Sequence, residues 1–413
     1  MYDVIVVGTR LAGAATAMLL ARAGARVLAV DQAAFPSDTL STHQMQVPGV
    51  SLLKRWGLLD RITFAGTPAT TAVSFAVAGS TIRGRMPVVD GADALFSPRR
   101  TLLDKILVDA AVAAGVELRQ RFVVEGLVRE GERVVGIEGR EKGGVSVVER
   151  ASIVVGADGK SSLVARAGGA RVLVEADPQT VAMYAYWQGF EQTAGEMHSL
   201  PGASVGVWPT NDGLTLIFVS RPRSEFRRDK AERTEDMLAT IDRCGDLGER
   251  VRSARLAETI RATIDVPNLV RMAHGAGWAL AGDARAVIDP LTGQGMTHAL
   301  KDAELLAGRL AAALGGTTTS IDAALAGYHR RRYRDLMPMF RLTVGLARHR
   351  PASSLQKAVY RALASRPEDS DRFFAVTSGA VAPSALFNPV SIARLLLRRR
   401  GSYSASNRSA VPA

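Results

Sequence analysis

The first residues whose types and spacing could carry chemistry form the turn GTRLAG at residues 8–13. An apolar run precedes this turn, and a second apolar run after it ends at Asp31. The spacing is that of a dinucleotide-binding fingerprint. Gly8 makes the turn, Gly13 lets helix and strand pack closely, and the amides at the helix start can bind a diphosphate. Asp31 can accept hydrogen bonds from an adenosine ribose. Arg10 replaces the middle glycine and could bring positive charge near a phosphate. The alternative is an ordinary βαβ turn in which Asp31 caps a local group.

Two further motifs follow much later in the chain. VVGADGKSSLVAR occupies residues 154–166 and LAGDARAVIDPLTGQGMTHALKDA occupies residues 280–303. Together with the first turn they resemble the three signatures of the group A FAD-dependent monooxygenases, the aromatic-hydroxylase superfamily, in that family's order and over about residues 1–345. The segment FPSDTLSTHQMQVPGV at residues 35–50 resembles a bacterial secondary-metabolism subgroup near the geranylgeranyl-reductase-like branch.

The resemblance implies non-covalently bound FAD and a role for each matching residue. Asp283 would accept a hydrogen bond from a ribitol hydroxyl, and residues 290–294 would line the flavin ring. The helix starting near Gly295 would aim its positive end at the pyrimidine side. Asp158 would lie where the FAD-binding domain meets the nucleotide path, and Arg100, with Arg99 as its competitor, would border the cofactor. The predicted cofactor-binding residues are Gly8, Arg10, Gly13, Asp31, Arg100, Asp158, Gly159, Gly282, Asp283, Pro290, Gly293, Gln294, Gly295 and Met296.

Two residues depart from the family pattern in the third motif. Arg285 replaces the histidine that commonly follows the motif's aspartate, and Met296 stands where an asparagine is usual. These changes concern the tuning of the flavin rather than its presence.

The resemblance also implies the reaction. NAD(P)H, as a transient co-substrate, would reduce FAD, and O2 would then give a flavin C4a-hydroperoxide that hydroxylates or epoxidises an electron-rich small molecule, in secondary metabolism. The absence of a second GxGxxG turn fits an enzyme with one dinucleotide domain. The alternative is an FAD-dependent reductase of isoprenoid double bonds. A basic binding protein with a vestigial flavin is disfavoured by the intact third motif.

Substrate contacts are expected from aromatic residues of a β-rich middle block, at about residues 180–265, and from one histidine in the 35–50 loop. Such residues more often pack in a core or lie at the surface. These residues are His43, Tyr184, Tyr186 and Trp208. No residue is assigned as catalytic.

Several enzyme classes are excluded by what the sequence lacks. Cys244 is the only cysteine, so neither a redox-active cysteine pair nor a multi-cysteine zinc site can form, and no metal site is expected. Flavin halogenases carry a Trp-x-Trp-x-x-Pro segment, and the nearest run here, VGVWPTN, does not match it.

The elements that must position these motifs follow from hydrophobic periodicity. Residues 2–31 predict a βαβ unit, residues 71–86 a hairpin around Gly79, and residues 116–155 several short strands. Helices are expected over residues 48–60, 98–114, 231–260 and 295–314, and through most of the last hundred residues.

The predicted fold class is α/β: a Rossmann-like FAD-binding domain with an inserted β-rich substrate domain and a helical C-terminal region. The FAD-binding domain would comprise residues 1–70, 98–180 and 266–345, and the substrate domain residues 71–97 and 181–265. Residues 346–400 would form C-terminal helices, and residues 401–413 a disordered tail.

The composition is that of a globular enzyme, with 47% hydrophobic and 22% charged residues in 413. A formal net charge of +12 could attract nucleic acid or anionic membrane, but the arginines are scattered and not interleaved with aromatic residues. We therefore expect a cytoplasmic protein whose partners are a small-molecule substrate and O2, without nucleic acid or membrane contact. A helix over residues 389–400 is expected to pack on the FAD-binding domain. No feature of the sequence indicates an oligomeric state.

Overall fold

The N-terminal βαβ unit forms as predicted. The computed structural model describes residues 1–397 except 42, 142, 191 and 228. In it, β1 (Tyr2–Val7), α1 (Leu11–Arg22) and β2 (Val27–Asp31) follow one another directly, and β1 and β2 pair in parallel. Buried apolar side chains dominate both strands, as expected of parallel strands covered on two faces.

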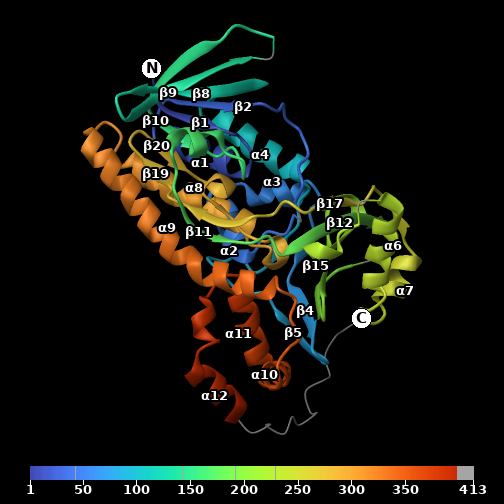
Figure 1. Ribbon diagram of the computed structural model, residues 1–413. Coiled ribbons are helices and arrows are strands. Elements are labelled where there is room, and N and C mark those ends of the chain that lie inside the picture. The colour runs from blue at the N-terminus through green and yellow to red at the C-terminus, as the bar shows by residue number, and fades with distance from the viewer. Residues whose placement is uncertain (42, 142, 191, 228, 398–413) are drawn as a thin grey trace.

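This unit is the centre of the first sheet, at the top of Figure 1. Its parallel strands run in the order β20-β10-β1-β2-β7, and β19 pairs antiparallel with β20. The added strands are β7 (Glu117–Gln120), β10 (Val147–Gly156), β19 (His274–Gly275) and β20 (Trp278–Leu280). The chain thus brings the ends of β1, β10 and β20, where all three motifs begin, to one edge of the sheet.

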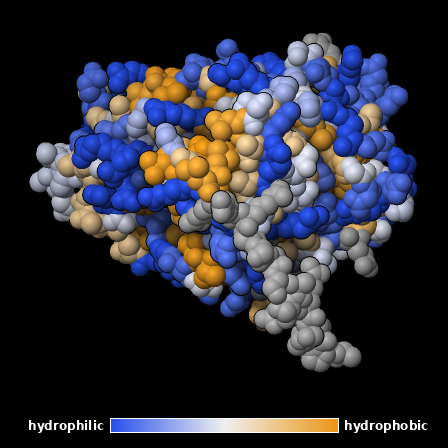
Figure 2. Space-filling model, turned by 90° about the horizontal axis from the view of Figure 1, so that it is seen from below, coloured by the Kyte–Doolittle hydropathy of each residue, from blue (hydrophilic) through white to orange (hydrophobic). Residues whose placement is uncertain are grey.

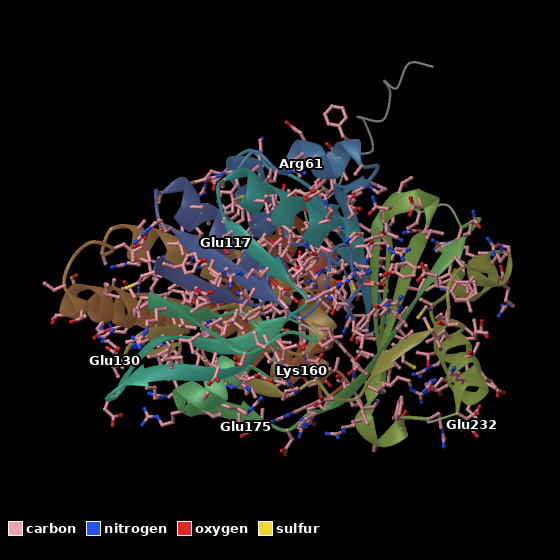
Figure 3. The ribbon with its side chains drawn as sticks, turned by 90° about the horizontal axis from the view of Figure 1, so that it is seen from above. Arg61, Glu117, Glu130, Lys160, Glu175 and Glu232 are labelled. Atoms are coloured by element: carbon pink, nitrogen blue, oxygen red, sulfur yellow. The ribbon has the colours of Figure 1, made fainter. Side chains whose placement is uncertain are left out.

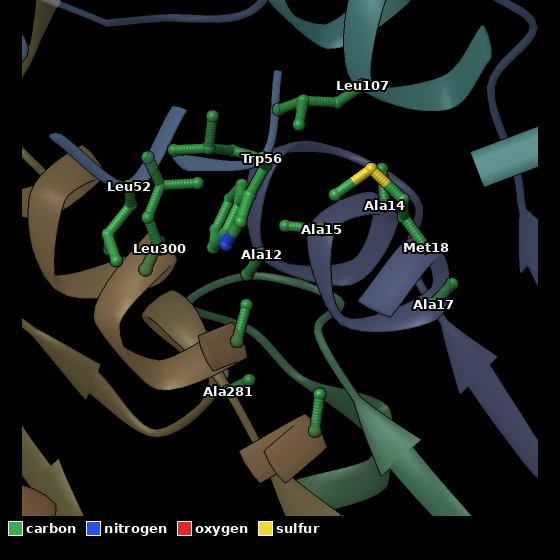
Figure 4. Packing of buried hydrophobic residues seen from close by; sticks show 14 of the residues in the cluster. Ala12, Ala14, Ala15, Ala17, Met18, Leu52, Trp56, Leu107, Ala281 and Leu300 are labelled. Atoms are coloured by element: carbon green, nitrogen blue, oxygen red, sulfur yellow. The ribbon is translucent and has the colours of Figure 1, made fainter. Parts of the chain in front are cut away.

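Helices cover one face of this sheet and a β-ribbon covers the other. Small residues of α1 lie among larger apolar side chains from α4 (Arg100–Ala113) and α8 (Gly295–Ala311), as Figure 4 shows for Ala15, Leu107 and Leu300. The opposite face packs against β8 (Phe122–Glu130), β9 (Arg133–Glu141) and α5 (Leu163–Gly168).

The second sheet is mostly antiparallel and lies to the right in Figure 1. Its order is β16-β12-β15-β14-β13-β4-β5, with β17 also paired to β12. The strands are β4 (Ala72–Val77), β5 (Ser80–Arg85), β12 (Thr180–Gln188), β13 (Gly195–Leu200), β14 (Ala203–Pro209), β15 (Thr215–Pro222), β16 (Arg255–Leu256) and β17 (Arg261–Thr263). The predicted hairpin over residues 71–86 is therefore part of this sheet, and α6 (Lys230–Ile241) and α7 (Leu247–Arg252) pack on it.

Smaller elements connect the two sheets. A three-stranded sheet has the order β11-β18-β21, and β3 pairs with β6. These strands are β3 (Ala69–Thr70), β6 (Leu95–Phe96), β11 (Val172–Ala176), β18 (Asn268–Arg271) and β21 (Ala286–Val287).

Two predicted helices differ from those observed. The helix predicted over residues 48–60 is two helices, α2 (Val47–Arg55) and α3 (Leu59–Phe64), because Gly57 adopts a φ of +75° after α2 ends. The helical stretch predicted over residues 231–260 ends with α7, and β16 then pairs with the end of β12.

The last part of the chain is helical, as predicted. α9 (Thr318–Leu346) is followed by α10 (Ser354–Ala364), α11 (Pro367–Thr377) and α12 (Pro389–Leu397). Contrary to expectation, α12 packs with α10 and α11 beneath β5 rather than on the first sheet. The predicted tail at 401–413 lies outside the described residues. Figure 2 views this underside, where hydrophobic patches alternate with hydrophilic ones. Among the described residues, no helix is long and apolar enough to cross a membrane.

The predicted α/β fold class is therefore confirmed. A Rossmann-like sheet, a second β-rich sheet and a helical C-terminal region are all present.

Candidate functional site

One cavity of about 790 Å³ lies where the first sheet, the second sheet and α8 meet. Its volume falls in the range of cofactor and small-molecule sites, roughly 300–1,000 Å³. Most predicted site residues line it: Gly8, Arg10, Asp31, Arg100, Asp158, Gly159, Tyr184, Gly282, Asp283, Pro290, Gly293, Gly295 and Met296. The predicted residues that are not part of its lining are Gly13, His43, Tyr186, Trp208 and Gln294.

The first turn is shaped by close backbone contact. Gly8 has a φ of +89°, and a Cβ at Gly13 would lie 1.7 Å from the Gly8 carbonyl oxygen. Asp31 holds the turn from β2: it accepts hydrogen bonds from the Thr9 amide (2.7 Å) and the Ala33 amide (2.8 Å). No side chain caps the start of α1, so its positive end opens onto the cavity. Asp31 therefore fixes the turn locally as well as lining the cavity.

Arg10 is held by protein groups beside this turn. Its guanidinium bonds Asp104 at 3.0 Å and the Ser37 carbonyl at 3.2 Å, which ties the 35–50 loop to α4. Arg100 bonds the same carboxylate at 2.9 Å, and Asp104 is fully buried. Of the two competing arginines, Arg100 lines the cavity, whereas Arg99 pairs with Glu258 at 2.6 Å. Two arginines on one carboxylate leave a net positive charge near the start of α1.

The third motif places Asp283 at the cavity wall. Gly282, with a φ of +61°, brings the strand end close to α1, where a Cβ would meet Ala12 at 2.7 Å. The surrounding protein partly desolvates the Asp283 carboxyl, and this raises its pKa although Arg100 and Lys160 oppose the shift. Arg285 turns away from the cavity and is buried against Asp302 at 2.8 Å.

In the second motif, Asp158 caps the start of α5, and an arginine outside the motif connects it to the third motif. Asp158 accepts hydrogen bonds from the Ser162 hydroxyl (2.5 Å) and the Leu163 amide (2.7 Å), so it fixes the start of α5. Arg271, which sequence reasoning missed, donates to the Lys160 and Ala284 carbonyls, both at 2.9 Å. Figure 3 shows Lys160 between the first sheet and the second. Arg271 is an isolated arginine in the sequence, so no pattern there could have revealed this bridge.

The 290–294 segment forms the wall at the start of α8. A Cβ at Gly295 would meet no atom within 4 Å, and no side chain caps this helix. Behind the wall, Gln294 donates to the Thr377 carbonyl at 2.8 Å and Lys301 to the Gly379 carbonyl at 3.4 Å. The end of α11 therefore supports the loop from the side away from the cavity.

An aromatic cluster lies at the second-sheet end of the cavity. Tyr184 and Tyr186 of β12 contact the buried His43 ring, at centroid distances of 5.8 and 5.7 Å. His43 Nε2 is hydrogen-bonded to the Tyr186 hydroxyl, while Nδ1 has no partner. Burial, with Arg100 and Arg99 nearby, holds the pKa of His43 well below its usual range, so the ring is neutral. Burial also raises the pKa of Tyr184, and Arg99 lies 4.1 Å above the Tyr186 ring.

Trp208 belongs to the same apolar cluster as the two tyrosines but does not line the cavity. Within the described part of the chain, no group of three or more His, Cys, Asp or Glu side chains could hold a metal ion.

The residues present fit FAD. Two uncapped helix starts, at α1 and α8, open onto one cavity and suit the diphosphate and the flavin's pyrimidine side. Asp31 and Asp283 place carboxylate acceptors near the two helix starts, where ribose and ribitol hydroxyls need partners. Gly295, with open space at its Cβ position, leaves the backbone accessible to a ligand.

Comparison with known families gives one match over most of the chain. The family is described as "FAD binding domain" and covers residues 1–341.

Known relatives and structures point to flavoenzymes of different activities. A digeranylgeranylglycerophospholipid reductase of Methanosarcina mazei is 27% identical over 347 residues, 81% of this chain and 81% of that protein. The flavin-dependent brominase Bmp2 superposes with a TM-score of 0.79 at 19% identity, over 95% of this chain and 97% of that one. PqsL of Pseudomonas aeruginosa, described as a probable FAD-dependent monooxygenase, superposes with a TM-score of 0.70 at 22% identity, over 91% of this chain and 99% of that one. At these identities the two solved structures establish a shared fold alone.

Proposed function

Since the chain belongs to the FAD binding domain family, the group A flavoproteins that its motifs predicted, it is an FAD-dependent oxidoreductase, and we propose that it is an NAD(P)H- and O2-dependent monooxygenase. The observation that carries the proposal is that one cavity continues from the two FAD turns to the wall formed by Tyr184. A cofactor and a small substrate can therefore share one cavity.

We propose that the predicted residues hold FAD as their family positions imply. Asp31 would bind the adenosine ribose, the α1 start and Arg10 the diphosphate, and Asp283 the ribitol. The 290–294 wall would contact the flavin ring. In this proposal residues 1–70, 98–180 and 266–345 bind FAD, and residues 71–97 and 181–265 carry the substrate wall.

When bound, FAD supplies hydride acceptance from NAD(P)H and activation of O2. The chain's own residues must orient the substrate and exclude water. Tyr184 is the predicted substrate residue that lines the cavity, and Tyr186 and His43 support it from behind. Because the pKa of Tyr184 is raised, its phenol stays protonated and can donate a hydrogen bond to a substrate oxygen.

A second candidate function is reduction of isoprenoid double bonds, favoured by the similarity to the Methanosarcina mazei reductase over 81% of the chain. It would use the same FAD site without O2. Residues such as Leu40, Val266 and Ile288 give the cavity an apolar lining that suits either an aromatic or an isoprenoid substrate.

Turnover under 18O2 separates the two functions. For the monooxygenase we expect slow basal NAD(P)H oxidation that yields hydrogen peroxide, strong acceleration by an electron-rich aromatic or polyketide-like compound, and one labelled oxygen atom in the product. The same reaction under strict exclusion of O2 is the control. An unlabelled product, or equal turnover without O2, rejects the monooxygenase and favours the reductase.

A further inference from the structure

Arg285, one of the two departures in the third motif, is part of a buried ion cluster behind the Asp283 turn. Asp302 of α8 accepts hydrogen bonds from Arg285 Nε at 2.8 Å and from the Gly282 amide at 3.0 Å. Its other oxygen accepts from Arg332 Nε of α9 at 2.6 Å. One carboxylate therefore joins the turn, α8 and α9.

This cluster directly contacts residues that line the cavity. Gly282 and Asp283 line the cavity, and so do Met296 and Ala299 of α8. Asp302 lies one turn beyond Ala299 on α8, is not part of the cavity lining and accepts a hydrogen bond from the Gly282 amide. Any charge in the cluster thus acts on the cavity through a single layer of protein.

The cluster carries an unbalanced positive charge. Arg285 and Arg332 are 1% and 3% exposed and share the single carboxylate of Asp302, which is fully buried. Burial lowers the pKa of Arg285, but Asp302 and Tyr328 together outweigh it and the pKa is raised, so the guanidinium stays charged. Arg285 Nη1 has no hydrogen-bond partner. A buried charge without full compensation is costly, which suggests that it serves something nearby.

Two neighbours respond to this charge. The pKa of His298 is well below its usual range, through burial first and Arg332 second. Burial and Arg332 also lower the pKa of Lys301 to about 8. The positive start of α8 adds to the same field.

We propose that the buried Arg285–Asp302–Arg332 cluster is a positioning and electrostatic device that stabilises reduced FAD over oxidised FAD. Two-electron reduction takes up two electrons and one proton from the nucleotide and leaves one added negative charge on the ring. A net positive charge behind the wall favours that anion, while the Asp302 bond to Gly282 keeps the turn in place. The proposal rests on the FAD site and is independent of which substrate is oxidised or reduced.

The test uses the full-length protein with purified FAD. Arg285→Met and Arg332→Met each remove one positive charge, and Arg332→Met leaves the Asp302 bonds to Gly282 and Arg285 intact. Each is expected to weaken binding of reduced FAD relative to oxidised FAD about tenfold, the order for one buried charge acting across one layer. For a two-electron couple this lowers the midpoint potential by about 30 mV. Arg285→Lys and Arg332→Lys keep the charge and should retain most of the wild-type potential.

Arg10→Met is the matched control, since Arg10 shares the buried Asp104 with Arg100 in a similar cluster at the α1 turn. It should weaken both redox forms of FAD equally and leave the potential unchanged. If Arg285→Met fails to fold, Arg332→Met still decides the point. An unchanged ratio of affinities in Arg332→Met overturns the proposal, whereas a wild-type protein that binds no FAD overturns the cofactor assignment itself.

Discussion

At the scale of single residues, Asp158 and Asp283 have different partners, although each lies beside a glycine in its motif. Asp158 is occupied by the Ser162 hydroxyl and the amides of Leu163 and Val164, so its main task is to start α5. Asp283 lies at the cavity wall on a turn held from behind by Asp302. We therefore propose that the first contributes mainly to stability and the second to FAD binding.

Substituting the two aspartates should separate these tasks. Asp283→Ala should weaken FAD binding by about 10- to 150-fold, the effect of losing a hydrogen bond to a charged group worth about 1.5–3 kcal/mol. Asp158→Ala should instead lower the free energy of unfolding by about 0.5–2 kcal/mol, the usual cost of a lost helix cap, with a smaller effect on affinity. Fluorescence titration with FAD and urea unfolding of both variants measure this. Equal FAD affinity in wild type and Asp283→Ala removes the ribitol assignment.

Most site residues predicted from the sequence line the cavity, but their partners were not predicted. The turns at Gly8, Asp158 and Gly282 follow from strand ends and glycines that local patterns reveal. The contact of His43 with Tyr186 joins residues 143 positions apart, and no local pattern predicts it. Asp302 and Arg332 look like ordinary helix charges in the sequence, and only their burial distinguishes them.

At the scale of elements, α1 depends on a glycine that admits no side chain. Gly13 lies against the Gly8 carbonyl at the crossing of α1 and β1, whereas Gly308 of α8 has open space around its Cβ position. Both are helical glycines, and their surroundings alone differ.

Alanine at the two positions should have opposite effects. Gly13→Ala must push α1 away from the turn, so we expect a loss of stability of a few kcal/mol and of FAD retention. Gly308→Ala should stabilise the protein by about 0.5–1 kcal/mol, since alanine is the better helix former and nothing obstructs it. Urea midpoints and the flavin content of the purified variants give the answer. A Gly13→Ala protein as stable and as yellow as the Gly308→Ala protein contradicts the packing argument.

Element boundaries were predicted less well than element types. Gly57 ends α2 early because its positive φ stops the helix, and the sequence alone did not distinguish this stop from a tolerated glycine. Residues 255–256 pair with Trp187 and Gln188 at the end of β12, so a strand partner overrides local helical preference there.

At the scale of the whole molecule, the cavity is assembled from segments between residues 7 and 299, and both sheets contribute walls. Folding of either part without the other cannot complete the site. Ligand binding and folding should therefore be coupled, as for any ligand that binds only the native chain.

FAD should stabilise the entire protein. At free FAD one hundred times the dissociation constant, the free energy of unfolding should rise by about 2.7 kcal/mol. Thermal or urea unfolding with and without added FAD measures this, and the Asp283→Ala variant, compared at the same FAD concentration, should gain less. A transition that does not move with FAD concentration would contradict a site built across both sheets.

The support of the 290–294 loop by α11 also has a consequence for synthesis on the ribosome. Gln294 and Lys301 bond carbonyls at Thr377 and Gly379, about eighty residues further along the chain. A nascent chain has made both sheets and the start of α8 well before those acceptors leave the exit tunnel. The 290–294 segment therefore gains these two supports only after about eighty more residues have been made, so the order of synthesis favours cofactor loading after α11 has formed.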